Sequence, residues 1–290
     1  MDRHELLRRI RTFPLLAEGL ADELLSGNFH SVFKGQGIEF DEVRHYEIGD
    51  DIRSIDWNVS ARFGRPYVKL YREERELTVC IVLDASASMH CGSGALNRYE
   101  QGLLGAALTA FSAERAGQRL GAVLFDQDIR KIYPPRKGRS HTMAIISGLL
   151  AVRDVQGGSG LGRALAGTNR LLKKRSLVLV ISDFLCINWE QELGDLCRKH
   201  DVIAIRISDP LDTDMPKAGF IKMEDPETGT GIYSLSSSGS FRSSWAQWHD
   251  ERAALWEAIC RRCGAARFVL STADDAALGL ARFFGGRPRT

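Results

Sequence analysis

Three oxygen-bearing side chains follow one apolar run of the sequence at alternate positions. The run TVCIVL, residues 78–83, ends in Asp84, and Ser86 and Ser88 come next. A short apolar run that stops at polar residues predicts a buried strand, and alternate residues of an extended chain point to the same side. The pattern therefore predicts a carboxylate and two hydroxyls grouped where a strand ends.

A second strand-like run also ends in an aspartate. Residues 176–182, SLVLVIS, lead into Asp183, and a glycine-rich turn at 157–160 with Ser159 at its tip lies between the two runs. Ligands of doubly wound sheets bind beyond the carboxyl ends of the strands, where the strand order reverses. In the common order 3-2-1-4-5-6, the strands ending in Asp84 and Asp183 are the first and the fourth, which are neighbours.

These side chains offer oxygen atoms alone, and oxygen-only sets suit hard cations. Mg²⁺ fits best because it keeps several of its waters, and Mn²⁺ is the second choice. Each piece also has a simpler interpretation, because a strand-terminal aspartate can cap the next helix and serines are common in turns. Their occurrence together favours a metal site that consists of Asp84, Ser86, Ser88, Ser159 and Asp183.

The chain from residue 77 onward alternates strand-like and helix-like segments. Strands that are apolar on both faces and separated by helices indicate a mostly parallel sheet covered on both sides. We therefore predict an α/β fold with a doubly wound sheet, in which the proline-containing run at 129–135 is an edge strand. The predicted strands are 77–84, 119–125, 129–135, 176–183, 201–208 and 266–271; the predicted helices are 98–117, 139–152, 161–174, 189–199, 242–263 and 274–284; a hairpin-like insertion is predicted at 219–235 and a serine-rich linker at 234–241.

The first 76 residues have a different character, and we predict that they precede the α/β domain of residues 77–290 as a separate part. Residues 3–26 are predicted to be helical, with a break near Pro14. Residues 31–76 are rich in charge, glycine and aromatic residues and show no sustained period. Because disordered segments are poor in aromatic residues, we predict an ordered, partly irregular or β extension.

Within this extension, the stretch GDDIRSIDW at 49–57 suggests specific contacts. We expect Gly49 to permit a turn, Arg53 to pair with Asp50 or Asp56, and Trp57 to anchor the loop. The charge-paired segment is interpreted as a structural cover of the main domain, and a partner surface is the alternative.

Composition indicates an ordinary globular protein. The chain has 290 residues, 44% hydrophobic and 26% charged, with a formal net charge of +2, so bulk charge does not point to a nucleic-acid partner. Its charged N-terminus does not resemble a secretory signal, and no apolar run has the length of a membrane span. Cys260 and Cys263 form one CxxC without a matching pair, which disfavours zinc and fits a reduced compartment. We predict a cytoplasmic location.

Two motifs resemble known families. The sequence DASAS, residues 84–88, matches the D-x-S-x-S motif of von Willebrand factor A domains, whose metal-ion-dependent adhesion site adds a threonine and an aspartate from later loops. The stretch from Gly35 to Met89 is similar to the DUF58 family, a bacterial group that contains such a domain. The resemblance implies that Asp84, Ser86 and Ser88 form the first part of the site and Asp183 the last.

The turn between them departs from the family pattern at two positions. Ser159 stands where a threonine is usual, so the hydroxyl is kept and the methyl is lost. Gly160 stands where an acidic or amide residue is common. We expect these departures to weaken the affinity for a metal or to loosen the loop.

The resemblance also implies a function. In adhesion-site domains, the metal accepts a carboxylate from a partner protein, and DUF58 proteins are typically encoded beside MoxR-type AAA+ ATPases. We therefore expect a non-enzymatic, metal-dependent interaction module, an adaptor or co-chaperone of such an ATPase. Candidate partner-binding residues besides the metal site are Arg136, Lys137, Asp50, Asp51 and Arg53.

Two alternatives remain from the residues. A Mg²⁺-dependent hydrolase or phosphatase could use the strand-end aspartates, but phosphatases of the haloacid-dehalogenase type need a second aspartate two residues on, where this chain has Ser86. The sequence also contains no Gly-Lys dipeptide of a P-loop and no HExxH. An anionic surface or nucleic acid could bind the basic run that contains Arg136 and Lys137, although we expect this run to help dock an acidic partner.

Overall fold

The structure is a computed structural model that describes residues 10, 13, 39–47, 49–72, 77–152, 157–224 and 230–285. The chain divides into two compact units, Ser31–Glu76 and a larger one of Met1–His30 with Leu77–Thr290. The smaller unit ends where the predicted boundary lies, while residues 1–30 group with the larger unit. Of the predicted helical segment 3–26, Ile10 and Phe13 are described, and both are helical and buried; the rest lies outside the described residues.

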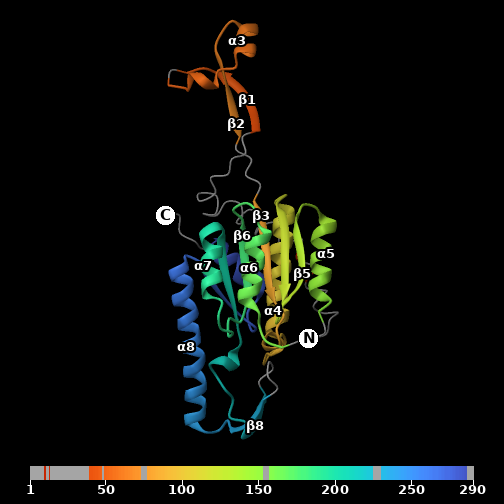
Figure 1. The fold of residues 1–290 in the computed structure, drawn as a ribbon, viewed down its shortest axis with the longest axis vertical. Coiled ribbons are helices and arrows are strands. Elements are labelled where there is room, and N and C mark those ends of the chain that lie inside the picture. Colours follow the sequence, from red (N-terminus) through yellow and green to blue (C-terminus); the bar gives the residue numbers. More distant parts are fainter. Residues whose placement is uncertain are drawn as a thin grey trace. The chain divides into compact units, whose positions relative to one another are not determined.

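A six-stranded sheet forms the centre of the larger unit (Figure 1). Its order, β10-β7-β6-β3-β4-β5, is the predicted 3-2-1-4-5-6 order, and all neighbours are parallel except β5, which pairs antiparallel with β4 at the edge. The predicted doubly wound, mostly parallel α/β fold is therefore confirmed. The strands are β3 (Thr78–Asp84), β4 (Arg119–Phe125), β5 (Ile129–Arg136), β6 (Leu177–Ser182), β7 (Asp201–Ser208) and β10 (Ala266–Ser271).

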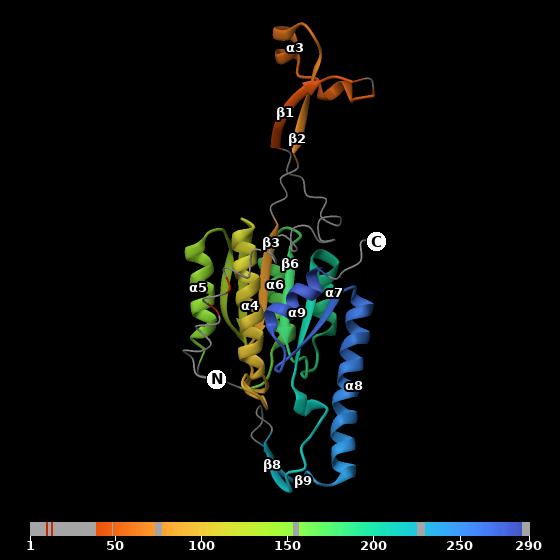
Figure 2. The same ribbon diagram turned by 180° about the vertical axis from the view of Figure 1, so that it is seen from behind.

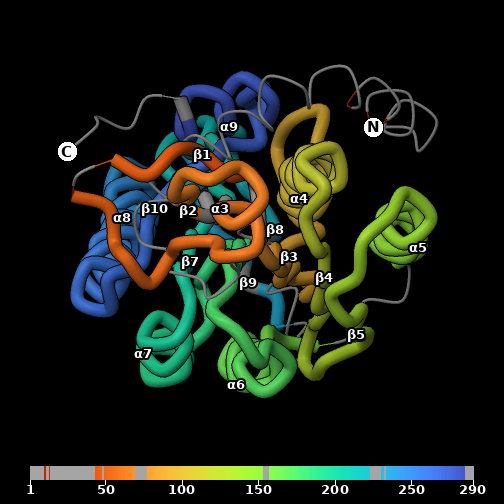
Figure 3. Tube along the Cα trace, turned by 90° about the horizontal axis from the view of Figure 1, so that it is seen from above, coloured from red at the N-terminus to blue at the C-terminus, as the bar shows by residue number. Residues whose placement is uncertain are grey.

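Helices cover both faces of this sheet (Figure 3). α6, α7 and α8 pack on one face, and α4, α5 and α9 lie on the other, as the views from front and back show (Figures 1 and 2). Two-sided cover explains why the central strands are apolar throughout, because both faces of each strand are removed from water. The helices are α4 (Arg98–Arg115), α5 (Arg139–Leu150), α6 (Leu161–Leu171), α7 (Glu190–Lys199), α8 (Gly239–Cys263) and α9 (Ala276–Gly285).

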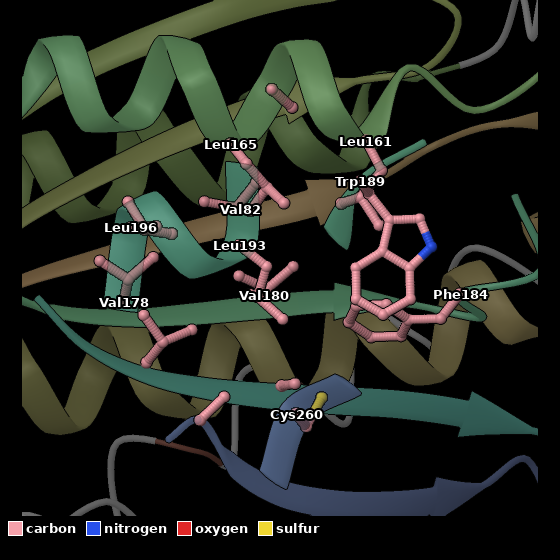
Figure 4. Packing of buried hydrophobic residues seen from close by; sticks show 14 of the residues in the cluster. Val82, Leu161, Leu165, Val178, Val180, Phe184, Trp189, Leu193, Leu196 and Cys260 are labelled. Carbon is pink, nitrogen blue, oxygen red and sulfur yellow. The ribbon is translucent and has the colours of Figure 1, made fainter. Parts of the chain in front are cut away.

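The core between the sheet and α6, α7 and α8 ends directly below the carboxyl edge of the strands (Figure 4). All six residues of β6 are buried, and Val180 packs in a cluster with Leu165 of α6 and Leu193 of α7. Burial of one such leucine is worth about 1.5–3 kcal/mol. The cluster continues to Phe184 and Trp189, which follow β6 at the edge where polar residues begin.

The predicted hairpin insertion is present, but the serine-rich linker after it is shorter than predicted. The hairpin consists of β8 (Phe220–Glu224) and β9 (Gly231–Leu235) (Figure 2). β9 includes the first two residues of the predicted linker, and α8 already begins at Gly239. The linker is reduced to residues 236–238, because antiparallel pairing with β8 and the helix take up the serine-rich sequence on both sides.

The smaller unit is an ordered β-hairpin with two short helices. β1 (Glu39–His45) pairs antiparallel with β2 (Tyr67–Arg72), and η1 (Ile52–Ser54) and α3 (Trp57–Phe63) connect them. The expectation of an ordered extension is thus met over residues 39–47 and 49–72, the part of this unit that the structure describes.

The contacts predicted for residues 49–57 need correction. Gly49 has the positive φ of 115° that a turn requires, but Asp50 accepts a hydrogen bond from Arg44 at 2.7 Å, not from Arg53. Asp56 instead caps α3 by accepting from two of its backbone N–H groups. Trp57 does not anchor the loop, since 68% of it is exposed. Arg44 and backbone N–H groups bond the carboxylates that charge pairing alone assigned to Arg53.

Gly148 of α5 offers a test of the packing between α5 and β5. A Cβ atom at this position would overlap the Tyr133 hydroxyl, so we expect Gly148→Ala to lower the free energy of unfolding by about 1–3 kcal/mol. Gly194→Ala in α7 is the control, because its Cβ would meet only the Cys263 Sγ at 3.6 Å, and removing a helical glycine stabilises by about 1 kcal/mol. Urea denaturation of both variants measures this; a stabilised Gly148→Ala would contradict the described packing.

Candidate metal centre

Asp84 is the central side chain of the candidate site. It is the last residue of β3 and is 0% exposed. Its Oδ1 accepts the backbone N–H of Ser86 at 2.9 Å. Its Oδ2 accepts two hydroxyl hydrogen bonds, from Ser159 at 2.8 Å and from Ser182 at 2.7 Å. One buried carboxylate therefore ties together the ends of two strands and the turn before α6.

Ser86 and Ser88 lie together in the turn that follows β3. Ser86 is the residue before the short helix η2 (Ala87–His90), and its side chain makes no capping hydrogen bond. The Oγ atoms of the two serines are 3.2 Å apart. The Ala87 N–H also contacts the carbonyl oxygen of Gly157 at 3.4 Å. The first and second predicted motifs are thus neighbours in space, as the sequence indicated.

Asp183 follows β6 and contributes a carboxylate oxygen that has no partner. The residue is 2% exposed, and its Oδ1 accepts the backbone N–H of Leu185 at 3.1 Å. Its Oδ2 is fully enclosed and makes no hydrogen bond to any described residue. A buried, unpaired carboxylate oxygen is costly, so this atom points to a ligand at the same place.

The backbone after Asp183 is strained in a way that fixes this carboxylate. Phe184 has a φ of +55°, which is uncommon for a bulky residue. Its N–H donates to the Ser182 Oγ at 3.1 Å. Its ring packs against Trp189, with the ring centroids 5.2 Å apart (Figure 4), and against Trp256, with the centroids 5.9 Å apart. The aromatic cluster therefore holds the turn in the conformation that positions Asp183.

The electrostatics of the site reflect two close, buried carboxylates. Burial, the largest cause, and the negative charge of Asp183 together raise the pKa of Asp84 from 3.8 to about 7. Hydrogen bonds from Ser182 and Ser86 oppose this rise. A divalent cation beside the pair would remove the repulsion and favour both ionised carboxylates.

The donor atoms fit a hard divalent cation. Ser159 donates its proton to Asp84, which leaves the lone pairs of its oxygen for a cation. The hydroxyls of Ser86 and Ser88 and the unpaired Oδ2 of Asp183 complete a set made of oxygen alone. Within the described ranges, no three His, Cys, Asp or Glu side chains are grouped as a metal site, so a site here must rely on hydroxyls and water, as Mg²⁺ readily does.

Gly160 explains one departure from the resembled motif. Its N–H donates to the Asp126 carbonyl oxygen at 2.6 Å, and a Cβ at this position would overlap the carbonyl oxygen of Gln127. The turn after β4 therefore leaves no room for the acidic or amide side chain found at this position in the family. Ser159 is the side chain of this turn that reaches Asp84.

Ser182 also belongs to the site, although it is not among the residues that the sequence pattern predicts. The β3–β6 register pairs Leu83 with Ile181, so the next residues, Asp84 and Ser182, lie beside each other on one face. The signal was present in the sequence as the serine before Asp183, but it becomes informative only once the strand order is known.

The other predicted partner-binding residues lie elsewhere. Arg136 pairs with Leu120 near the start of β4, whereas Asp84 pairs with Phe125 at its end. Arg136 and the adjacent Lys137 are therefore at the opposite edge of the sheet and are exposed. The remaining three belong to the smaller unit, where Asp50 bonds Arg44 and Asp51 accepts the backbone N–H of Arg53.

Comparisons with known proteins give a family and a fold. The model of a family described as "Protein of unknown function DUF58" matches residues 42–254. The uncharacterized protein Rv1480 of Mycobacterium tuberculosis is 30% identical over 292 residues, which cover 100% of this chain and 92% of that protein.

Two solved structures are similar at a TM-score of 0.50. The conserved hypothetical protein BatB from Bacteroides thetaiotaomicron is 15% identical and covers 72% of this chain and 98% of its own. An aerotolerance-related membrane protein from Bacteroides fragilis is 14% identical and covers 73% and 100%. At such identities the likeness concerns the fold alone. In the described part of the present chain, no helix is long and apolar enough to cross a membrane.

The buried carboxylate predicts an unusual pH dependence of stability in a chelator. Because the pKa of Asp84 is raised from 3.8 to about 7 in the folded state, the folded protein binds the extra proton between these values and loses stability as the pH rises through them. Asp84→Asn removes this cost. We expect the free energy of unfolding of the variant to rise relative to that of the wild type from pH 4 to pH 7, by about 4 kcal/mol at most. Above pH 7 the difference between the two should stay constant.

Urea denaturation in EDTA across this pH range measures the difference. Asp201→Asn is the control, since Asp201 bonds the exposed Arg175 at the opposite edge of the sheet. Parallel stability curves for wild type and Asp84→Asn would contradict the raised pKa.

Proposed function

The chain belongs to the DUF58 family, and we propose that its larger unit is a non-enzymatic protein-interaction module. In this proposal the candidate metal centre binds Mg²⁺ or Mn²⁺ and docks a carboxylate from a partner protein. The observation that carries the proposal is the enclosed Oδ2 of Asp183, which has no partner among the described residues and belongs to a site whose other donors are oxygens. The resemblance of DASAS, residues 84–88, to adhesion-site motifs supports the same assignment.

Each side chain would have a separate role. Ser86, Ser88 and Ser159 would offer hydroxyl oxygens, and Asp183 would offer Oδ2 directly or through water. Asp84 would act through other groups, because its oxygens already accept the Ser159 and Ser182 hydroxyls and hold the lone pairs of Ser159 toward the centre. With so few protein charges at the centre, a bound cation would supply an electrophilic position that favours an incoming anionic oxygen.

A hydrolase built on the same aspartates has less support. A phosphatase nucleophile must reach the substrate phosphorus, but Asp84 is 0% exposed and both its oxygens accept hydrogen bonds. The position of a general acid two residues on is Ser86, whose hydroxyl is too weak an acid for that role. The geometry favours binding over covalent chemistry.

For the partner we propose a MoxR-type AAA+ ATPase, with the chain acting as its adaptor or co-chaperone in the cytoplasm. The support is the resemblance to DUF58 proteins, and it is an argument from family likeness. The carboxylate would come from an acidic side chain on the ATPase or on a client protein that both bind.

Metal binding is tested most sharply at Ser159. We expect Mn²⁺ titration, followed by the electron paramagnetic resonance signal of the free ion, to show saturable binding by the wild type. Ser159→Ala should weaken binding about 10–100-fold, because it removes a donor that Asp84 orients, while Ser159→Thr should bind nearly as well as the wild type. Absence of binding by the wild type at millimolar Mn²⁺ would defeat the proposal.

Partner binding is tested with the purified MoxR-type ATPase from the same organism. We expect complex formation with the wild type in Mg²⁺, loss of the complex in EDTA, and loss with Asp183→Asn, which keeps the size of the side chain. Leu255→Ser, at an exposed position of α8, is the control and should retain the complex. A complex of equal affinity in EDTA and Mg²⁺ would contradict metal-dependent docking, and turnover of a phosphate ester that depends on Asp84 would favour the hydrolase.

A further inference from the structure

Arg206 lies in the same row of the sheet as the central residues of the candidate metal centre. The β3–β6 register places Asp84 beside Ser182, and the β6–β7 register pairs Ser182 with Arg206. Paired residues of parallel strands share a face, and neighbouring strands lie about 4.8 Å apart. The side chains of all three residues therefore leave the sheet on one face, at its carboxyl edge.

The guanidinium group of Arg206 has no partner in the described part of the chain. The residue is only 8% exposed, yet no hydrogen bond or ion pair joins it to any described residue. Arg98 shows the contrast, because it is equally buried and bonds Asp212 at 2.5 Å. An arginine carries five N–H donors and is always charged, so burying it without an anion is costly.

The charged end of Arg206 is not sealed off from solvent. The enclosed and unpartnered atoms of the described chain include the Arg98 Nε and both ring nitrogens of His249, but none of the nitrogens of Arg206. Each Arg206 nitrogen therefore keeps some contact with solvent. Its exposed 8% is thus partly at the charged end of the side chain.

Two acidic residues near Arg206, Asp212 and Asp183, already accept hydrogen bonds from other groups. Asp212 accepts from Arg98 and from the Asp209 N–H, and the Oδ1 of Asp183 accepts from Leu185. Burial, the largest effect, lowers the pKa of Arg206, while the charges of Asp212 and Asp183 raise it. Arg206 is thus within electrostatic reach of the centre and is not neutralised by a direct contact.

We propose that Arg206 is the second anchor of the carboxylate that docks at the candidate metal centre. It donates hydrogen bonds from its planar guanidinium to the same carboxylate that the cation attracts. The partner group is then an aspartate or glutamate side chain, and a neutral amide of the same shape is rejected because it leaves the arginine unpaired. This inference rests on the proposed function, and it adds a residue that selects the charge of the incoming group.

A purely structural role makes a different prediction. If Arg206 only balanced the buried charges of Asp183 and Asp212, its removal would change cation affinity and would not affect a bound carboxylate. If it anchors the ligand, its removal weakens carboxylate binding even when the cation is saturating.

The experiment measures the two affinities separately in the full-length chain. Mn²⁺ affinity is measured first, and acetate is then titrated at saturating Mn²⁺, with the paramagnetic relaxation of its methyl protons as the signal and acetamide as the neutral probe. We expect saturable binding of acetate and not of acetamide by the wild type, and at least a tenfold loss of acetate affinity in Arg206→Gln with Mn²⁺ affinity retained. Arg206→Lys should fall between the two, because it keeps the charge and loses the planar fork.

Arg136→Gln is the matched control, because Arg136 lies on β5 at the end of the sheet opposite to the candidate metal centre. This variant should bind acetate as the wild type does. Unchanged acetate affinity in both Arg206→Gln and Arg206→Lys would overturn the proposed role of Arg206. The proposed metal centre would not be affected by that result. Failure of the wild type to bind Mn²⁺ would overturn the proposed function, and this inference with it. If Arg206→Gln does not fold, the acetate affinity of Arg206→Lys decides the question.

Discussion

The burial of one carboxylate at the edge of the sheet is the constraint on which the rest of the site depends. Asp84 is enclosed, and it accepts hydrogen bonds from three sequence segments: the turn after β3, the turn before α6 and the end of β6. The bond from Ser182 requires the strand order that places β3 beside β6. The carboxylate therefore links three segments of the fold by hydrogen bonds and also orients the hydroxyls of Ser159 and Ser182.

The site contains two close carboxylates and, nearby, the guanidinium group of Arg206, which pairs with neither of them. Asp84 and Asp183 raise the free energy of the metal-free state by their mutual repulsion, and Asp183 keeps an oxygen without a partner. Arg206 lies in the same row but bonds neither of them. A cation at the centre would compensate the negative charge of the aspartates, and an anion that binds both the cation and Arg206 would pair the guanidinium group. For this reason we expect the cation to bind first and the anion to bind after it.

Much of the scaffold could be predicted from the sequence, because it follows from local rules. Apolar runs that alternate with helical segments indicated the doubly wound sheet, and the prolines of β5 marked it as an edge strand. Features set by distant contacts could not be predicted. Gly160 is required because the backbone of Gln127 leaves no room for a side chain. Ser182 and Arg206 can be placed near Asp84 only when the strand register is known. Charge pairing misled at Asp50 and Asp56, because backbone N–H groups and Arg44 took these carboxylates.

An anomalous difference map from crystals grown with Mn²⁺ would test the candidate metal centre directly. We expect a peak among the hydroxyl oxygens of Ser86, Ser88 and Ser159 and the Oδ2 of Asp183, with Asp84 still bonded to the Ser159 and Ser182 hydroxyls. A map without a peak at this position at millimolar Mn²⁺, or with the ion bound elsewhere on the chain, would contradict it.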